Sequence, residues 1–140
     1  MTTSRVLLLA ATVANVLGWV LPVVRDYRGV HAFRVALSPI WPYEHFQIPS
    51  GHLVVLSVAS AATNLLFVAI AGAVWLGLVA SRARQRVAVF VVGAAALLNL
   101  HWPLSMGQSA PDLRAGYYVW VLSFVLLLLA VHPALAARRR

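Results

Sequence analysis

The chain has 140 residues, of which 62% are hydrophobic and 10% are charged, and its formal net charge is +8. Soluble domains carry about a quarter charged residues, so this composition excludes an ordinary soluble domain and favours an integral membrane protein. The chain contains no cysteine, which excludes disulfides, thiolate zinc sites and a cysteine nucleophile.

The apolar residues gather into four runs, and about 20 apolar residues of helix are enough to cross a bilayer core. The predicted helices cover residues 6–24, 51–80, 87–102 and 117–136. A signal peptide is the alternative for the first run, but that run is longer than a typical signal-peptide core, so an uncleaved helix is favoured. We therefore predict an all-α fold: an integral membrane four-helix bundle that forms one transmembrane domain over residues 1–140.

The predicted first outer loop, residues 25–50, is the longest polar interval of the chain. Its three prolines prevent a continuous helix, because each removes an N–H donor and restricts the residue before it. A short interfacial helix is predicted over residues 30–37, with its alanine, valine and leucine side chains facing the lipid. Trp41, Tyr43 and Phe46 then follow, a pattern typical of an aromatic belt at the membrane interface. The other aromatic residues predicted at this outer interface are Trp19, Trp102, Tyr117, Tyr118 and Trp120.

The second and third predicted helices are joined by the basic sequence SRARQR, interpreted as a tight turn. Ser50 is the predicted N-cap of the second helix. That helix of roughly 30 residues would be about 45 Å long, which exceeds the bilayer core and requires a strong tilt. The third helix is predicted to end before Pro103, because proline does not continue helical hydrogen bonding.

The arginines predict the orientation, because cytoplasmic loops of membrane proteins carry an excess of basic residues. The predicted cytoplasmic segments contain seven arginines: Arg5, Arg82, Arg84, Arg86, Arg138, Arg139 and Arg140. The predicted outer loops contain four: Arg25, Arg28, Arg34 and Arg114. We therefore predict a multi-pass protein of a bacterial inner membrane with both termini cytoplasmic. The same division of charge makes the lipid bilayer the predicted partner and argues against nucleic acid.

Every predicted helix carries polar residues away from its ends, and these share faces with small residues. The predicted polar seam contains Asn15, Ser60, Asn64, Asn99 and Ser123. A buried amide costs several kcal/mol unless it finds a hydrogen-bond partner, so these side chains should point into the bundle. Packing between helices is the first interpretation, and a small polar binding pocket in the outer half is the alternative.

The predicted outer side also carries four of the five histidines and one glutamate. The candidate ligand-binding residues are Glu44, His52, Asn64, Asn99 and His101. His52 and His101 fall at similar predicted depths and are candidate axial ligands of a haem. Asn99 and His101 with nearby aromatic residues are a candidate quinone site. The spacing between Glu44 and the histidines matches no metal-binding motif, so no metal and no cofactor is assigned.

No catalytic motif occurs: GxSxG, Walker and GxGxxG sequences are absent, and the three carboxylates all fall in predicted loops. The sequence therefore favours a non-catalytic protein without excluding an enzyme. The first functional prediction is a non-catalytic structural or accessory subunit that assembles with other membrane proteins or with copies of itself. The alternative is a protein that binds haem, quinone or metal at its outer end, within a membrane redox or transport complex.

Overall fold

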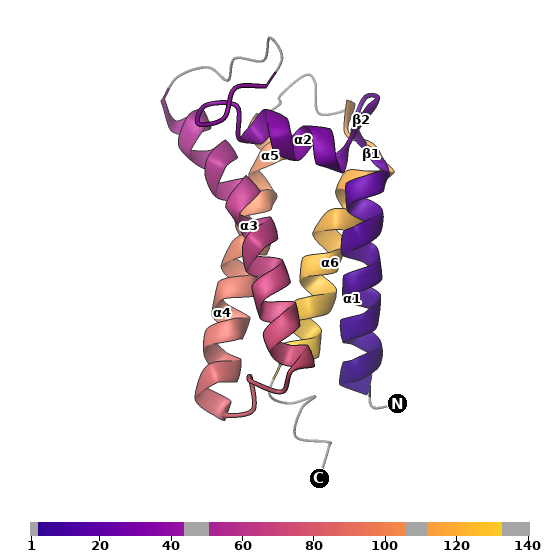
Figure 1. The fold of residues 1–140 in the computed structure, drawn as a ribbon, viewed down its shortest axis with the longest axis vertical. Coiled ribbons are helices and arrows are strands. Elements are labelled where there is room, and N and C mark those ends of the chain that lie inside the picture. Colours follow the sequence, from indigo (N-terminus) through magenta and orange to yellow (C-terminus); the bar gives the residue numbers. More distant parts are fainter. Residues whose placement is uncertain (1–2, 44–50, 106–111, 133–140) are drawn as a thin grey trace.

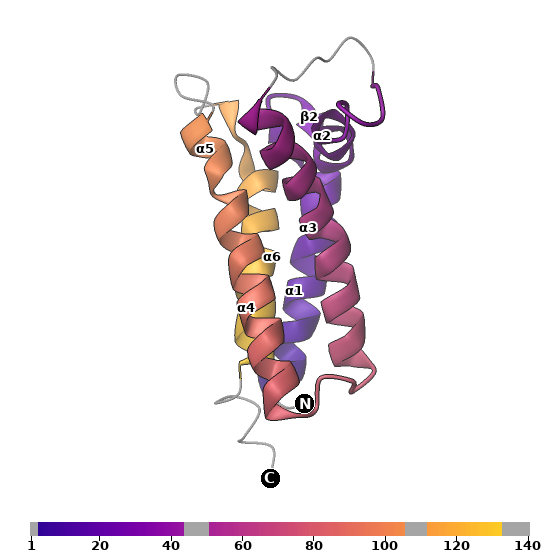
Figure 2. The same cartoon turned by 90° about the vertical axis from the view of Figure 1, so that its left-hand side faces the viewer.

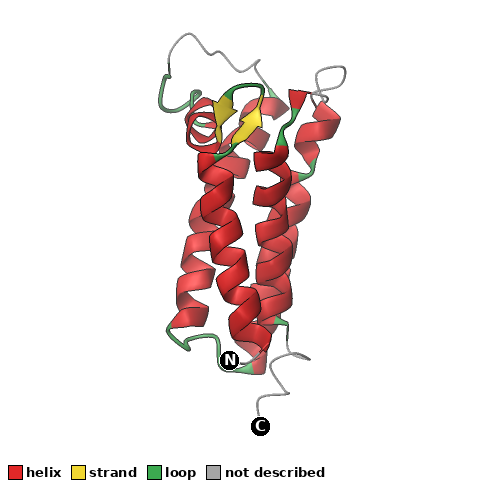
Figure 3. Cartoon of the chain, turned by 90° about the vertical axis from the view of Figure 1, so that its right-hand side faces the viewer, coloured by secondary structure: helices red, strands yellow, loops and turns green. Residues whose placement is uncertain are grey.

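The computed structural model describes residues 3–43, 51–105 and 112–132, and most of these residues are helical. The longest helices run alongside one another: α1 (Thr3–Val20), α3 (His52–Trp75), α4 (Arg82–Asn99) and α6 (Ala115–Val131) (Figures 1 and 2). One end of the molecule carries the shorter elements, here called the hairpin end. They are β1 (Pro22–Val24), β2 (Tyr27–Arg28), α2 (Gly29–Ala36) and α5 (His101–Ser105) (Figure 3).

Three of the described helical segments are long and apolar enough to cross a membrane. They are α1, α3 and the segment Arg82–Leu104, which contains α4 and most of α5. The fourth long helix, α6, is apolar but has 17 residues. The prediction of a mostly helical chain is therefore confirmed. The short hairpin β1–β2 was not predicted.

The first two long helices end earlier than the sequence pattern predicted. Helix α1 ends at Val20 instead of residue 24, because Pro22 has no N–H to continue it and the chain turns into β1. Helix α3 ends at Trp75 instead of residue 80. Gly77, with φ 73°, closes it in the left-handed conformation that glycine adopts without a steric penalty. The resulting 24-residue helix is about 36 Å long, so it requires less tilt than predicted.

The basic sequence SRARQR is not a loop, because it forms the first turn of α4. Ser81 is the N-cap, and its Oγ accepts a hydrogen bond from the Arg84 backbone N–H at 3.3 Å. Helix α4 ends at Asn99, before Pro103 and three residues earlier than predicted, but a further short helix, α5, then runs through Pro103, which was not predicted. Pro103 lies in the first turn of α5. Backbone N–H groups in a first turn have no acceptor within their own helix, so proline is tolerated there.

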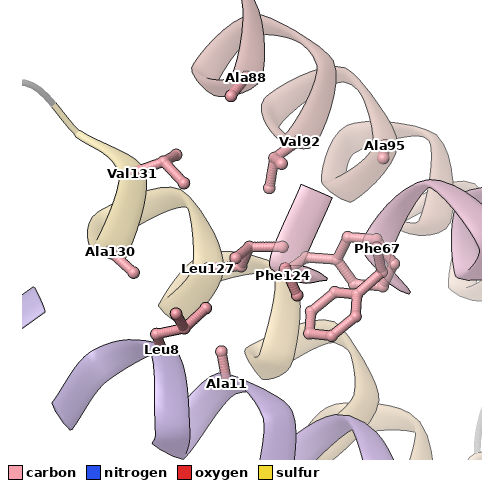
Figure 4. Packing of buried hydrophobic residues seen from close by; sticks show 11 residues of the cluster. Leu8, Ala11, Phe67, Ala88, Val92, Ala95, Phe124, Leu127, Ala130 and Val131 are labelled. Carbon is pink, nitrogen blue, oxygen red and sulfur yellow. The ribbon is translucent and has the colours of Figure 1, made fainter. Parts of the chain in front are cut away.

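The main apolar core lies between α1, α3, α4 and α6, toward the end opposite the hairpin (Figure 4). Phe124 and Leu127 of α6 are its most buried large side chains. The rings of Phe67 and Phe124 meet edge to face with centroids 5.3 Å apart, which joins α3 to α6. Many other apolar side chains, including Phe90 and Leu97 of α4, are exposed on the outside of the molecule.

Helices α1 and α6 pack most closely, and glycine permits this approach. A Cβ added to Gly18 would lie 2.7 Å from the Cβ of Trp120. A Cβ added to Gly116 would lie 2.5 Å from the backbone oxygen of Pro22. Small residues at such contacts let backbones approach each other, as membrane helix interfaces require. The position of the hairpin against α6 therefore depends on Gly116.

The segment that leads into α6 pairs with the hairpin through a single antiparallel β-bridge between Val24 and Leu113. The Arg25 N–H donates to the Asp112 carbonyl at 2.8 Å, and the Arg114 N–H donates to the Val23 carbonyl at 2.9 Å. Arg25 has φ 48°, a left-handed conformation that is uncommon for a residue with a side chain. Its Nε donates to Asp112 Oδ2 at 2.9 Å. These bonds fasten the hairpin to the start of α6.

Candidate functional site

A cavity of about 400 Å³ lies at the hairpin end, which is within the range of about 300–1,000 Å³ typical of small-molecule sites. Its wall comes from α1, the hairpin, α2, α3, α5 and the first turns of α6. Its lining includes Trp19, Arg25, Ala32, Phe33, Ala36, Ser60, Asn64, Trp102, Asp112, Tyr117 and Trp120.

Helix α2 forms the roof of this cavity and lies across the ends of the longer helices (Figure 1). Five of its residues line the cavity, and four of these, Gly29, Ala32, Phe33 and Ala36, recur at the spacing of one helical face, Val35 being the fifth. The predicted short helix is therefore present, shifted by one residue, but its alanine face is directed into the molecule and not outward as predicted. The ring of Phe33 packs against Trp19 of α1 with centroids 5.1 Å apart, which holds the roof to the wall.

Several aromatic residues that the sequence assigned to an interfacial belt form the cavity wall instead. Tyr117 is 4% exposed, and Trp102 and Trp120 are partly buried. The indole N–H groups of both tryptophans donate to polar side chains of α3 inside the molecule. Trp41 is exposed, as a belt residue would be, and Phe46 lies outside the described residues.

Asn64 of α3 lies at the cavity surface with only 7% of its area exposed. Its Oδ1 accepts a hydrogen bond from Trp120 Nε1 at 2.9 Å. An indole N–H can only donate, so this contact fixes the amide with its oxygen toward Trp120. The amide nitrogen Nδ2 makes one long bond of 3.3 Å to the Ala61 carbonyl of its own helix.

A second group of hydrogen bonds joins α3 to α4 and α5 around Asn99, which is fully buried. Ser60 Oγ donates to Asn99 Oδ1 at 2.7 Å, and Asn99 Nδ2 donates to Thr63 Oγ1 at 3.0 Å. The Trp102 indole donates to Ser60 Oγ at 2.9 Å. Thr63 Oγ1 also donates to the Ser60 carbonyl at 2.6 Å. Asn99 is therefore a structural link between helices.

Tyr117 compensates for the missing N–H of Pro103. In a continuous helix the carbonyl of Asn99 would accept a bond from the N–H of the residue four positions later, which is Pro103. The hydroxyl of Tyr117 donates to that carbonyl instead, at 2.9 Å in a buried position. The tyrosine of α6 thereby supports the break between α4 and α5.

Tyr117→Phe is expected to lower the free energy of unfolding by about 1–2 kcal/mol, because it leaves the buried Asn99 carbonyl without a donor. Pro103→Ala restores a backbone N–H four residues after Asn99. In that background Tyr117→Phe should cost clearly less, and thermal unfolding of the four proteins in detergent measures the coupling. An equal loss in both backgrounds would contradict the proposed compensation.

The polar seam also extends to α1. Asn15 Nδ2 donates to Ser123 Oγ at 3.2 Å, and Ser123 Oγ donates to the Trp120 carbonyl at 2.6 Å. Asn15, Ser60, Asn64, Asn99 and Ser123 are all buried, as the sequence indicated. Each has a hydrogen-bond partner within the same chain. Within the described residues, the polar side chains of this seam therefore find their hydrogen-bond partners without a second protein.

The predicted ligand-binding residues are not brought together as a set. Asn64 lines the cavity, whereas Asn99 is buried beneath it and engaged in bonds between helices. His101 Nδ1 contacts the Leu98 carbonyl, and its ring lies against Trp102. His52 is exposed at the start of α3, and Glu44 lies outside the described residues.

No histidine is found in the described lining of the cavity. A haem in this cavity would therefore lack the axial ligands that His52 and His101 were suggested to supply. The described residues also contain no group of three or more His, Asp or Glu side chains that could hold a metal ion. What the described walls offer is an aromatic and aliphatic surface with a few polar groups.

The sequence did not single out Tyr117, Trp120 and Trp102 as site residues. A partial signal was present, because residues 117, 120 and 123 recur at the spacing of one helical face and end on the predicted seam residue Ser123. The roof residues Ala32, Phe33 and Ala36 gave no such signal, since an apolar helical face indicates lipid as readily as a cavity.

The chain matches no protein-family model, and neither the curated proteins nor the solved structures contain a significant match to it.

Proposed function

We propose that this chain is a membrane protein with four spans, α6 being the fourth. The three segments of sufficient length support the membrane assignment. At 17 residues α6 is about 25 Å long, slightly less than a bilayer core of about 30 Å. Local thinning of the bilayer accommodates a mismatch of this size at a modest cost.

The proposed orientation has the hairpin end outside and both termini in the cytoplasm of a bacterium. The start of α1, the end of α6 and the connection between α3 and α4 lie at the same end of the molecule (Figure 1). Arg82, Arg84 and Arg86 are exposed there. The positive-inside rule therefore supports a cytoplasmic location for this end.

Reporter fusions after residues 38, 84 and 110 test this orientation. A periplasmic reporter such as alkaline phosphatase should be active after residues 38 and 110 and inactive after residue 84. A cytoplasmic fluorescent reporter should give the opposite pattern. Phosphatase activity after residue 84 would contradict the orientation.

We further propose that the protein binds a small, largely apolar ligand in the cavity at the hairpin end. The observation that carries this proposal is the volume of about 400 Å³ behind α2, with aromatic walls and the buried amide of Asn64 at its surface. Such a combination of apolar walls and few polar groups is typical of small-molecule sites. The described lining contains no acid–base or nucleophilic pair, so the proposed role is binding and not catalysis.

The cavity favours this function over the accessory-subunit prediction. The polar seam was the main reason to expect assembly with another chain, and its hydrogen bonds close within this chain. Exposed apolar side chains on α3 and α4 are what lipid contact requires of a membrane helix, so they call for no protein partner. Assembly with other proteins stays a prediction that nothing in the fold specifically favours.

The proposal predicts that a small apolar molecule is retained through purification in a mild detergent. Organic extraction followed by mass spectrometry should recover it from the wild-type protein. Ala32→Trp should abolish its recovery, because Ala32 lines the cavity and the larger side chain would occupy the ligand volume.

Val30→Trp is the matched control, because Val30 lies on the same helix with 44% of its area exposed and is not part of the described lining. It should leave recovery unchanged. Equal recovery from both folded variants would place any retained molecule outside the cavity and contradict the proposal.

A further inference from the structure

We infer that the ligand of this cavity is an uncharged planar ring, aromatic or quinonoid, that presents a carbonyl oxygen to the amide N–H of Asn64. This inference rests on the proposed binding function and specifies the chemical class of the ligand. It follows from the hydrogen-bonding roles that remain unused at the cavity surface, from the shape of the walls and from their charge.

The amide nitrogen of Asn64 is a hydrogen-bond donor at the surface of the cavity. Asn64 Oδ1 is occupied by the Trp120 indole, which turns Nδ2 away from Trp120. Nδ2 carries two hydrogens, and its one bond among the described residues is the long contact with Ala61. For its second hydrogen no acceptor is found among the described residues, and Asn64 is only 7% exposed. A buried donor without a partner is unfavourable, so an acceptor on the ligand is the complementary group.

The neighbouring hydroxyl of Ser60 does not offer a donor. Its only hydrogen is given to Asn99 Oδ1 at 2.7 Å, and its oxygen already accepts from the Trp102 indole at 2.9 Å. The hydroxyl of Tyr117 is likewise given to the Asn99 carbonyl. Of these three polar side chains, Asn64 is therefore the one that can bind a ligand oxygen without breaking an internal bond.

The walls favour a flat ring over a flexible chain. Trp19 and Phe33 face the cavity from α1 and α2, and Trp102, Tyr117 and Trp120 face it from α5 and α6. Aromatic side chains contact other rings favourably in offset-stacked or edge-to-face arrangements, beyond the effect of area alone. An acyl chain would gain the apolar contact but would leave the amide hydrogen of Asn64 without an acceptor.

The charge of the described lining favours a neutral ligand. Arg25 and Asp112 are its charged members, and they pair with each other at 2.9 Å. Their opposite charges cancel, and the Arg25 side chain is 68% exposed at the edge of the cavity. An anionic or cationic ring would enter an apolar space that offers it no uncompensated counter-charge, at a large desolvation cost.

The test compares two probes of similar shape: menadione, a naphthoquinone with two carbonyls, and methylnaphthalene, which has none. Equilibrium dialysis against purified protein in detergent, corrected for uptake by protein-free micelles, gives the affinities. The chain has no cysteine, so menadione cannot form a thiol adduct that would imitate binding. The wild-type protein should bind menadione about tenfold more tightly than methylnaphthalene, which is the expected contribution of one buried hydrogen bond.

Asn64→Leu should remove this preference by weakening menadione binding about tenfold while leaving methylnaphthalene binding unchanged. Asn15→Leu is the matched control, because it deletes a seam amide that does not line the cavity, and it should keep the preference. If Asn64→Leu does not fold, infrared spectroscopy of menadione on the wild-type protein still decides, since a hydrogen-bonded carbonyl absorbs at lower wavenumber.

The outcomes separate the inference from the function on which it rests. Equal binding of both probes to the wild-type protein, or an unshifted carbonyl band, would overturn the carbonyl assignment while leaving an apolar ligand in the cavity. Recovery of a lipid acyl chain from the cavity without competition by menadione would overturn the planar ring. Failure of both probes to bind, with no molecule co-purifying, would overturn the binding function as well.

Discussion

Gly116→Ala is expected to destabilise the protein strongly. The new Cβ would lie 2.5 Å from the backbone oxygen of Pro22, a separation that requires the hairpin or α6 to move. Overpacking of this kind typically costs about 1–3 kcal/mol, and a backbone obstacle yields less readily than a side chain. The loss should be seen as a lower midpoint of thermal unfolding in detergent.

The same substitution at Gly72 provides the control. Gly72 also lies within a helix, but a Cβ added there meets no atom within 4 Å. Gly72→Ala should therefore raise stability by up to about 1 kcal/mol, because alanine is the better helix former. If both variants unfolded at the same temperature, the close approach of Pro22 to α6 would be wrong.

Asn99→Leu is the second change with a large expected effect. It removes the bond from Ser60 and the bond to Thr63 together, in a position with 0% exposure. Interhelical hydrogen bonds in membrane proteins contribute about 0.6 kcal/mol on average and up to about 1.7 each. We therefore expect a loss of about 1–3 kcal/mol, measured by thermal or denaturant unfolding in detergent.

Asn15→Leu should cost less, because Asn15 donates one bond of 3.2 Å to a Ser123 hydroxyl that keeps its own bond to the Trp120 carbonyl. A double-mutant cycle of Asn99→Leu with Ser60→Ala isolates the link between α4 and α3. Full additivity of the two losses would show that this bond does not stabilise the fold.

The buried seam could be read from the sequence because polar residues inside an apolar run have few alternatives. Asn15, Asn64 and Asn99 each stand among aliphatic residues, and the cost of a bare amide directs them inward. The short helix α2 was also predictable, since prolines limit the segment that follows it. These features depend on local composition, which a sequence states directly.

The hairpin and the cavity were not predictable in the same way. The strand Pro22–Val24 continues an apolar run and is extended because Pro22 stops α1 and because residues 112–114 pair beside it. That pairing joins positions far apart in the chain, since Arg25 and Asp112 are separated by 87 residues. Periodicity within one segment carries no information about such contacts.

The positions of the aromatic residues were also not predictable from the sequence. A tryptophan near the end of a membrane helix predicts an interfacial position, and this was the interpretation for Trp102 and Trp120. Both instead direct their indole N–H groups to Ser60 and Asn64. The choice depends on whether α2 covers the helix ends, and this is a property of the assembled fold.

Photolabelling with a naphthoquinone that carries a diazirine would locate the ligand on the protein. After irradiation of the protein in detergent, peptide mass spectrometry locates the attached label. We expect attachment at cavity residues such as Phe33, Ala36 and Trp102, with loss of the label when unmodified menadione competes. Labelling confined to the exposed outer faces, at Phe90 and Leu97 of α4, and unaffected by menadione would show that the hairpin-end cavity is not a ligand site.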